Sequence, residues 1–233
     1  MVRFAPFAAA VILMAAPAMA QQQPDRLVDM QVIASSLGVS CTYCHAGRGA
    51  PPAVTASGKS RQDVAREMIA MTRALNATVQ TAAGKPANET VPVGCITCHR
   101  GVPIPRQLTD VLWTTTLRQG GPAAATQYRE LRTQFYGKQA YDFGEDTLIT
   151  IASRIGQARP DDAIALMNLN LEFFPRSVRS HVTLAIAQSR GDAPAAIATL
   201  KKALEIEPEN GEIKGRLYQL EQLVERQNRI RPQ

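Results

Sequence analysis

The chain has 233 residues, enough for one large domain or two small ones. Hydrophobic residues make up 45% of it and charged residues 20%, which is the composition of an ordinary globular protein. The formal net charge of +6 is spread along the sequence without a basic run, so nucleic acid is not an expected partner.

Residues 1–20 have the features of a secretory signal peptide. Arg3 supplies the positive charge, residues 7–16 are nearly all apolar, and Ala18-Met19-Ala20 is a small-x-small cleavage pattern. We expect cleavage after Ala20 and a periplasmic or otherwise extracytoplasmic protein; an uncleaved N-terminal anchor is the alternative. No later apolar run is long enough for a bilayer span. A soluble mature chain is therefore expected, with association to a membrane kept as a second option.

All four cysteines lie in two copies of one pattern, Cys41-Thr42-Tyr43-Cys44-His45 and Cys95-Ile96-Thr97-Cys98-His99. Two thiols at this spacing can form thioethers with the two vinyl groups of one haem. The histidine that follows then lies under the ring as the proximal iron ligand. The motifs predict two covalently attached c-type haems per chain, with His45 and His99 as iron ligands.

Other uses of a Cys-x-x-Cys pair are a disulfide, half of a zinc site, or a thioredoxin-like redox pair. None of them explains why a histidine follows both pairs in a chain with only three histidines. Haem attachment is therefore favoured. The third histidine, His181, lies far from both motifs and is expected to be structural or on the surface.

The small number of histidines also limits which residue can be the second axial ligand of each haem. Because only His181 remains, bis-histidine ligation of both haems within one chain is excluded, and methionine is the obvious substitute. Met30 lies on a predicted helix that ends at Gly38, and Met68 and Met71 lie on a second predicted helix. By spacing alone, each of these methionines is explained equally well as a core residue.

Three segments resemble the haem-binding part of the photosynthetic reaction-centre cytochrome c subunit family. They are Leu37-Gly-Val-Ser-Cys-Thr-Tyr-Cys-His45, Ala65-Arg-Glu-Met-Ile-Ala-Met-Thr-Arg-Ala-Leu-Asn76 and Gly94-Cys-Ile-Thr-Cys-His-Arg-Gly-Val-Pro103. The resemblance implies haem units in which a helix carries the axial methionine and a turn leads to the Cys-x-x-Cys-His helix. It implies Met30 as the ligand of the first haem and Met68 as that of the second, with Met71 as the fallback.

The resemblance spans about residues 25–106. Full subunits of the family carry four haems in two such halves, whereas this chain has the motifs of one half. It also has no histidine between Asn76 and Gly94 that would serve as a distant ligand. The resemblance therefore supports haem ligation more than docking to a reaction centre.

Beyond Pro103 the sequence changes character and contains no further cysteine. A helix is predicted over residues 123–136, and a repeat of about 33 residues follows, in which Ala163-Ile164-Ala165 recurs as Ala196-Ile197-Ala198. We expect two tetratricopeptide-like helical hairpins and a capping helix over about residues 211–227. Such repeats bind a protein partner or pack on a neighbouring domain. Trp113 is expected to anchor the packing between the two parts of the chain.

The sequence thus predicts an all-α protein with a signal peptide (1–20), a dihaem cytochrome c domain (21–106), a helical linker (107–140) and tetratricopeptide-like repeats (141–233). The predicted function is electron transfer between periplasmic or membrane-bound redox partners, with a photosynthetic reaction centre among the candidates. If His and Met occupy both axial positions of each haem iron, no position is left for a substrate. An enzyme is therefore not expected.

Two alternative functions remain at this point. One is a dihaem peroxidase-like enzyme with one five-coordinate haem, and the other is a redox-sensing protein whose repeats bind a partner. Arg73, Arg100 and Arg106 are candidate partners of the haem propionates, with a solvated surface position as the alternative for each.

Overall fold

The computed structural model describes residues 27–47 and 53–230. In this part of the chain every regular element is a helix, apart from one isolated bridge between Val54 and Ser60. The all-α fold class expected from the sequence is confirmed. The predicted signal peptide lies outside the described residues.

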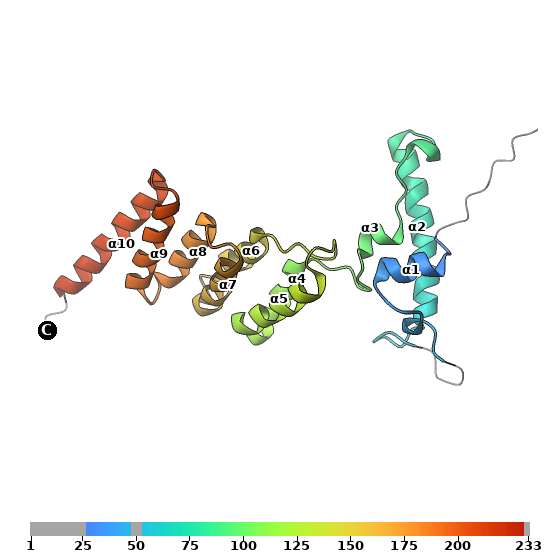
Figure 1. Ribbon diagram of the computed structural model, residues 1–233, viewed down its shortest axis with the longest axis horizontal. Helices are drawn as coiled ribbons and strands as arrows, with labels where there is room; N and C mark the ends of the chain where they lie inside the picture. Colours follow the sequence, from blue (N-terminus) through green and yellow to red (C-terminus); the bar gives the residue numbers. More distant parts are fainter. Residues whose placement is uncertain (1–26, 48–52, 231–233) are drawn as a thin grey trace, which may run out of the picture.

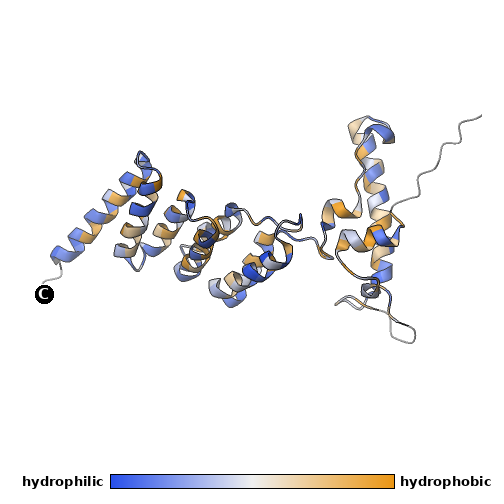
Figure 2. Ribbon diagram, viewed as in Figure 1, coloured by the Kyte–Doolittle hydropathy of each residue, from blue (hydrophilic) through white to orange (hydrophobic). Residues whose placement is uncertain are grey.

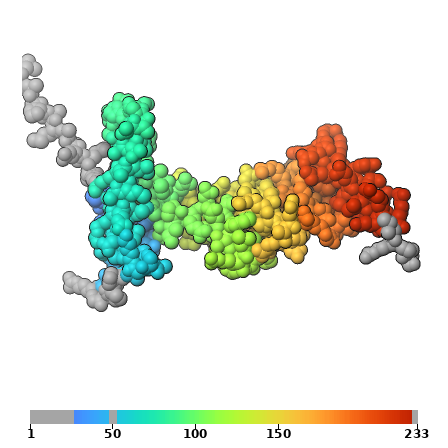
Figure 3. Space-filling model, turned by 180° about the vertical axis from the view of Figure 1, so that it is seen from behind, coloured from blue at the N-terminus to red at the C-terminus, as the bar shows by residue number. Residues whose placement is uncertain are grey.

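The helices form two groups that follow one another along the molecule (Figure 1). The first group contains α1 (Met30–Leu37), the 3-10 helix η1 (Cys41–Tyr43), α2 (Arg61–Ala83), the 3-10 helix η2 (Ala87–Glu89) and α3 (Cys95–His99). The second contains α4 (Leu108–Gln119), α5 (Gly121–Phe135), α6 (Glu145–Ile155), α7 (Pro160–Phe173), α8 (Val178–Gln188), α9 (Ala193–Ile206) and α10 (Gly211–Ile230). The long helix α2 stands across one end of the molecule, and α4 to α10 extend away from it (Figures 1 and 3).

Capping residues define the two longer helices of the first group. The Asp29 carboxylate accepts hydrogen bonds from two backbone amides in the first turn of α1, at 2.8 and 3.3 Å. The helix ends at Gly38 with φ 65°, as the sequence predicted. The hydroxyl of Ser60 caps the start of α2, and Gly84 ends that helix with φ 60°.

The end of α1 packs directly on the turn that follows α3. The backbone amide of Gly101 donates to the carbonyl of Ser36 at 2.8 Å. A Cβ atom on Gly38 would lie 2.1 Å from the carbonyl oxygen of Gly101, so only glycine fits there. This close approach holds α1 and α3 together as one unit.

The second group is a stack of antiparallel helix pairs, α4 with α5, α6 with α7 and α8 with α9, followed by α10 on α9. This arrangement is compatible with the predicted tetratricopeptide-like repeats. The segment 107–140 departs from the expected linker, because α5 also packs on α7 and α4 on α6. Leu112 and Tyr128 are fully buried in the same cluster as Leu148 and Leu166. Apolar residues at helical spacing therefore make this segment the first layer of the stack.

Trp113 also belongs to the stack. Its side chain packs against the cluster of buried residues, and the guanidinium of Arg154 lies 4.5 Å from its ring centroid. These contacts join α4 to α6 inside the stack. Trp113 therefore packs within the stack and not, as had been expected, between the two parts of the chain. His181, on α8, is buried with its Nε2 atom 3.2 Å from the carbonyl oxygen of Pro175. That position fits the structural role predicted for it.

The hydrophobic core lies almost entirely in the stack. Both clusters of buried apolar residues fall between Leu108 and Ile213. Among the described residues before Leu108, Val102 is the single buried hydrophobic side chain. Large hydrophobic side chains are exposed in that same part, namely Val28, Met30, Val54, Met71, Leu75, Val91, Ile96 and Ile104. Hydrophobic residues gather on α1, α3 and the adjoining part of α2 (Figure 2), so this part has apolar surface without a packed core of its own.

Candidate functional site

The first Cys-x-x-Cys-His motif faces α1 across a small apolar cavity of about 40 Å³. Four of the residues predicted to hold the first haem line this cavity, which are Met30, Cys41, Cys44 and His45. The side chain of Met30 is 59% exposed. The structure therefore brings together all four residues, although they come from two separate elements.

The start of α2 holds this motif in place. Arg61 donates from Nη1 to the carbonyl of Tyr43 at 2.9 Å, and its guanidinium lies 4.0 Å from the Tyr43 ring centroid. The side-chain nitrogen of Gln62 lies 3.3 Å from the carbonyl oxygen of Cys44 and 3.0 Å from Nδ1 of His45. These residues are about 17 positions apart in the sequence. Nothing in the local pattern signalled that Arg61 and Gln62 would contact the motif.

The second motif opens on a larger cavity of about 270 Å³ between α1, α2 and α3. Three of the residues predicted for the second haem line it, namely Met68 from α2 and Cys95 and His99 from α3. Its remaining lining is mostly apolar and includes Ile33, Leu37, Val64, Ala65, Ile69, Pro103 and Ile104. An apolar chamber with a histidine and a methionine in its lining is the environment that a haem ring needs.

The imidazole of His99 is buried and oriented by the backbone. Its Nδ1 atom lies 3.0 Å from the carbonyl oxygen of Val102. Because a carbonyl can only accept, Nδ1 carries the proton and Nε2 keeps its lone pair. Histidines that bind a metal through Nε2 are held in the same way, with the other nitrogen donating to an acceptor.

The segment before the second motif is tied to α2. The side-chain amide of Asn76 donates to the carbonyl of Val93 at 2.9 Å and accepts from its backbone amide at 2.7 Å. This pair of bonds fixes the approach to Cys95. Burial raises the pKa of the Cys95 thiol, a hydrogen bond from its backbone lowers it, and the neighbouring Cys98 raises it further.

The two methionines of α2 differ in their surroundings. Met68 is half-buried and lines the larger cavity, and its carbonyl accepts a hydrogen bond from the buried Thr72 hydroxyl at 2.7 Å. Met71 is 51% exposed and lies outside the lining of either cavity. Of the two methionines, Met68 is therefore the one that shares a cavity with His99.

The two cavities share part of their walls. Ile33, Leu37 and Cys44 line both of them. Cys44 therefore belongs to the first motif and at the same time borders the chamber of the second. The two candidate sites are direct neighbours.

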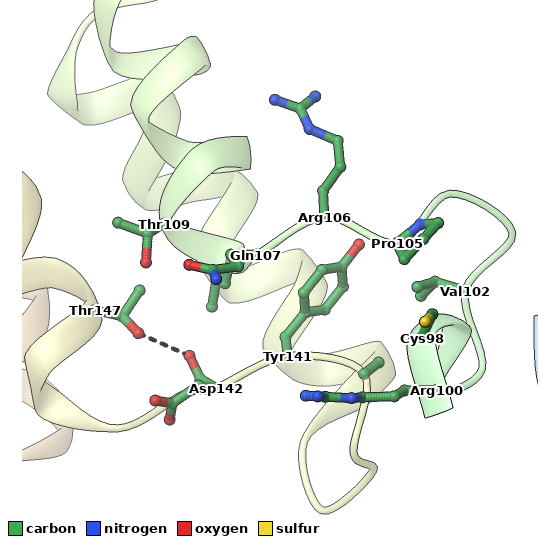
Figure 4. Close-up of a pocket in the computed structure, with 12 residues that line it drawn as sticks. Cys98, Arg100, Val102, Pro105, Arg106, Gln107, Thr109, Tyr141, Asp142 and Thr147 are labelled. Carbon is green, nitrogen blue, oxygen red and sulfur yellow. Dashed lines mark hydrogen bonds between the residues drawn. The ribbon is translucent and has the colours of Figure 1, made fainter. Parts of the chain in front are cut away.

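Cys98 does not line the larger cavity but a polar pocket of about 420 Å³ between the first group of helices and the stack (Figure 4). The side chain of Arg100 extends along Tyr141 toward Asp142 in this pocket. Arg106 points away from Tyr141 and donates to the hydroxyl of Thr114 at 3.2 Å. Two of the three candidate propionate partners, Arg100 and Arg106, thus line this pocket and neither of the two apolar cavities.

No disulfide joins any two of the four cysteines. Within residues 27–47 and 53–230, no three His, Cys, Asp or Glu side chains lie together as a metal cluster. No helix in the described part of the chain is long and apolar enough to cross a bilayer.

One segment of the chain matches a known protein family. Residues 50–142 match the family described as photosynthetic reaction centre cytochrome C subunit. That segment resembles this cytochrome family. The resemblance drawn from the sequence is thereby confirmed over the matched residues, which include Met68 and the whole second motif.

The match has definite limits. It covers less than half of the chain, begins after the first motif and continues through α4 and α5. No curated protein matches the chain significantly. The match supports haem c binding, electron transfer with redox-protein partners and a non-enzymatic role.

Proposed function

We propose that the chain is a dihaem c-type cytochrome that carries electrons between redox partners outside the cytoplasm. The observation that carries the proposal is that the histidine and at least one cysteine of each Cys-x-x-Cys-His motif share an apolar cavity with a methionine from a neighbouring helix. The described part before α4 also has no hydrophobic cluster of its own. Two porphyrin rings would supply that part with the apolar core that its sequence lacks.

The first haem would be attached through Cys41 and Cys44, with His45 and Met30 as axial ligands. This assignment rests on their common position around the smaller cavity. Thioether attachment at Cys41 and Cys44 places His45 next to the iron by covalent geometry alone. Met30, from α1, would supply the second ligand of this iron.

The second haem would be attached through Cys95 and Cys98, with His99 and Met68 as axial ligands. The Nδ1 proton of His99 is already held by the Val102 carbonyl, which leaves Nε2 for the iron. The presence of Met68, from α2, in the lining of the same cavity supports it as the sixth ligand.

A haem iron supplies a one-electron couple whose potential depends on its axial ligands and surroundings. The residues of the chain bind the rings, orient the histidines and keep water away from the second site. Because Ile33, Leu37 and Cys44 border both cavities, the two proposed haems would be neighbours across these side chains. Electrons would pass between the haems by this route and leave to a partner.

Two other functions fit the site less well. A peroxidase-like enzyme needs an iron with a free position, whereas a methionine lines each cavity here. A redox sensor would use the stack of α4 to α10 to bind a protein, and the stack does offer such a surface. We propose electron transfer as the main function, with redox proteins or a membrane electron-transfer complex, including a photosynthetic reaction centre, as partner. Export would depend on the proposed signal peptide, residues 1–20.

The test is to produce the full chain in a host that attaches c-type haem and to measure covalent haem per chain as the pyridine haemochrome. Two haems per chain are expected, with a sulfur-to-iron charge-transfer band in the ferric protein and slow binding of carbon monoxide by the ferrous protein. Cys44→Ser and Cys98→Ser should each remove one covalent haem. Extraction of all haem by acidified acetone would refute covalent attachment. A high-spin spectrum with rapid carbon monoxide binding would favour the peroxidase-like alternative.

A further inference from the structure

The first turn of α2 places a side-chain amide against the first proximal histidine. Gln62 is half-buried, and its backbone amide donates to the capping hydroxyl of Ser60 at 3.2 Å, which fixes its position at the helix start. Its Nε2 atom lies 3.0 Å from Nδ1 of His45 and 3.3 Å from the carbonyl oxygen of Cys44. The contact therefore joins the beginning of α2 to the residue that would bind the first iron.

The two proximal histidines are supported by different kinds of group. His99 has a backbone carbonyl, that of Val102, at 3.0 Å from Nδ1. His45 has a side chain in the same position, the amide of Gln62. A backbone acceptor cannot be altered by substitution, whereas a side-chain acceptor can be strengthened or removed.

Ligation of His45 through Nε2 requires a proton on Nδ1, and that proton needs an acceptor. The oxygen and nitrogen of an amide side chain have the same shape and exchange places by a half-turn about the last bond. After this half-turn, Oε1 of Gln62 faces Nδ1 of His45. The same half-turn removes the hydrogen bond from Nε2 to the carbonyl of Cys44, which lies in a largely exposed motif where solvent can take its place.

We propose that Gln62 is the positioning residue of the first haem: its side-chain oxygen accepts the Nδ1 proton of His45, fixes the plane of the imidazole and increases its donation to the iron. This inference rests on the proposed function. The basicity of a metal-bound histidine rises with the strength of the acceptor on its other nitrogen. Residue 62 therefore sets the potential of the first haem and leaves that of the second unchanged.

Three variants of the full haem-loaded chain test this role. Gln62→Leu removes the acceptor, and Gln62→Glu replaces it with a stronger, charged one. Gln80→Leu is the matched control, because it is the same substitution on α2 near the other end of the helix. In an optical redox titration, Gln62→Leu should raise the midpoint potential of the first haem and Gln62→Glu should lower it. The midpoint of the second haem should stay constant, and Gln80→Leu should move neither.

A spectroscopic readout separates this role from a general effect on folding. In a Met30→Ala background the first ferrous iron becomes five-coordinate, so its iron–histidine stretch is visible by resonance Raman. The frequency of the stretch should fall with Gln62→Leu and rise with Gln62→Glu. Unchanged frequencies and potentials in both variants, at full haem content, would overturn the role of Gln62. Absence of covalent haem on Cys41 and Cys44 in the unaltered chain would instead refute the proposed function itself.

Discussion

The carbonyl oxygen of Gly101 occupies the space that a side chain on Gly38 would need, since a Cβ atom there would lie only 2.1 Å from it. Gly38 ends α1 just before the first motif, and Gly101 follows the second. The two Cys-x-x-Cys-His motifs are therefore joined through a backbone contact that depends on glycine.

Gly38→Ala should destabilise the protein in two ways. The left-handed conformation, with φ 65°, costs a residue with a side chain roughly 1–2 kcal/mol. The contact with Gly101 adds a further cost of about 1–3 kcal/mol for overpacking. Gly84→Ala is the control, because φ is 60° there and nothing lies within 4 Å of the added Cβ. Denaturant unfolding followed by circular dichroism measures both; equal losses would show that the Gly101 contact is unimportant.

Met68→Ala should open the second iron to external ligands. We expect the ferrous variant to bind about one carbon monoxide per chain rapidly, with loss of part of the sulfur-to-iron charge-transfer band of the ferric protein. Met71→Ala should leave both properties unchanged, because Met71 is 51% exposed and does not line the cavity. Stopped-flow spectroscopy checks the first property and absorbance the second. The opposite pattern would transfer the ligand role to Met71.

Leu112→Ala should destabilise the helical stack by about 2–5 kcal/mol, because the side chain is fully buried and its removal leaves a cavity. Leu117→Ala, on the same helix but 49% exposed, should change stability by about 0.5 kcal/mol or less. Thermal unfolding of the two variants provides the comparison. Similar small effects would mean that α4 is a linker after all.

Tyr128→Phe should alter how stability depends on pH. Burial raises the pKa of the Tyr128 phenol, while the nearby Arg132 lowers it. The folded protein therefore binds this proton more tightly than the unfolded chain, and the resulting stability is complete below the unfolded pKa of about 10. It is lost as the pH rises through that value toward the folded pKa.

Near neutral pH the Phe variant should be less stable by roughly 1 kcal/mol, because it lacks the hydrogen bond to the Phe143 carbonyl at 3.3 Å. Above the unfolded pKa the difference between the two proteins should shrink. Urea unfolding across this pH range measures the difference, and a constant gap would argue against the raised pKa.

Local patterns were enough to predict several features. The Cys-x-x-Cys-His spacing, the end of α1 at Gly38 and the helical stripe that carries Met68 each depend on residues close in sequence. Met30 and His45 line one cavity and Met68 and His99 line the other, and their pairing as axial ligands, drawn from the family resemblance, stays a prediction.

Other features depend on how helices pack, which a single sequence does not specify. The contacts of Gln62 with His45 and of Asn76 with Val93 each join residues 17 positions apart, through polar groups that have no characteristic spacing. The burial of Leu112 and Tyr128 requires α6 and α7 to cover α4 and α5. The sequence pattern showed only that residues 107–140 form helices, and this segment was therefore predicted to be a linker.

The shortage of buried apolar residues before α4 has a consequence for biosynthesis. In a chain that lacked the proposed haems, side chains such as Ile96, at 52% exposure, and Ile104, at 67%, would be left in solvent. Exposed apolar surface of this kind invites aggregation and proteolysis. The stack, with its own core, has no such dependence. Attachment of the cofactors would then act as a quality-control step, in which incompletely matured chains are removed before they reach a partner.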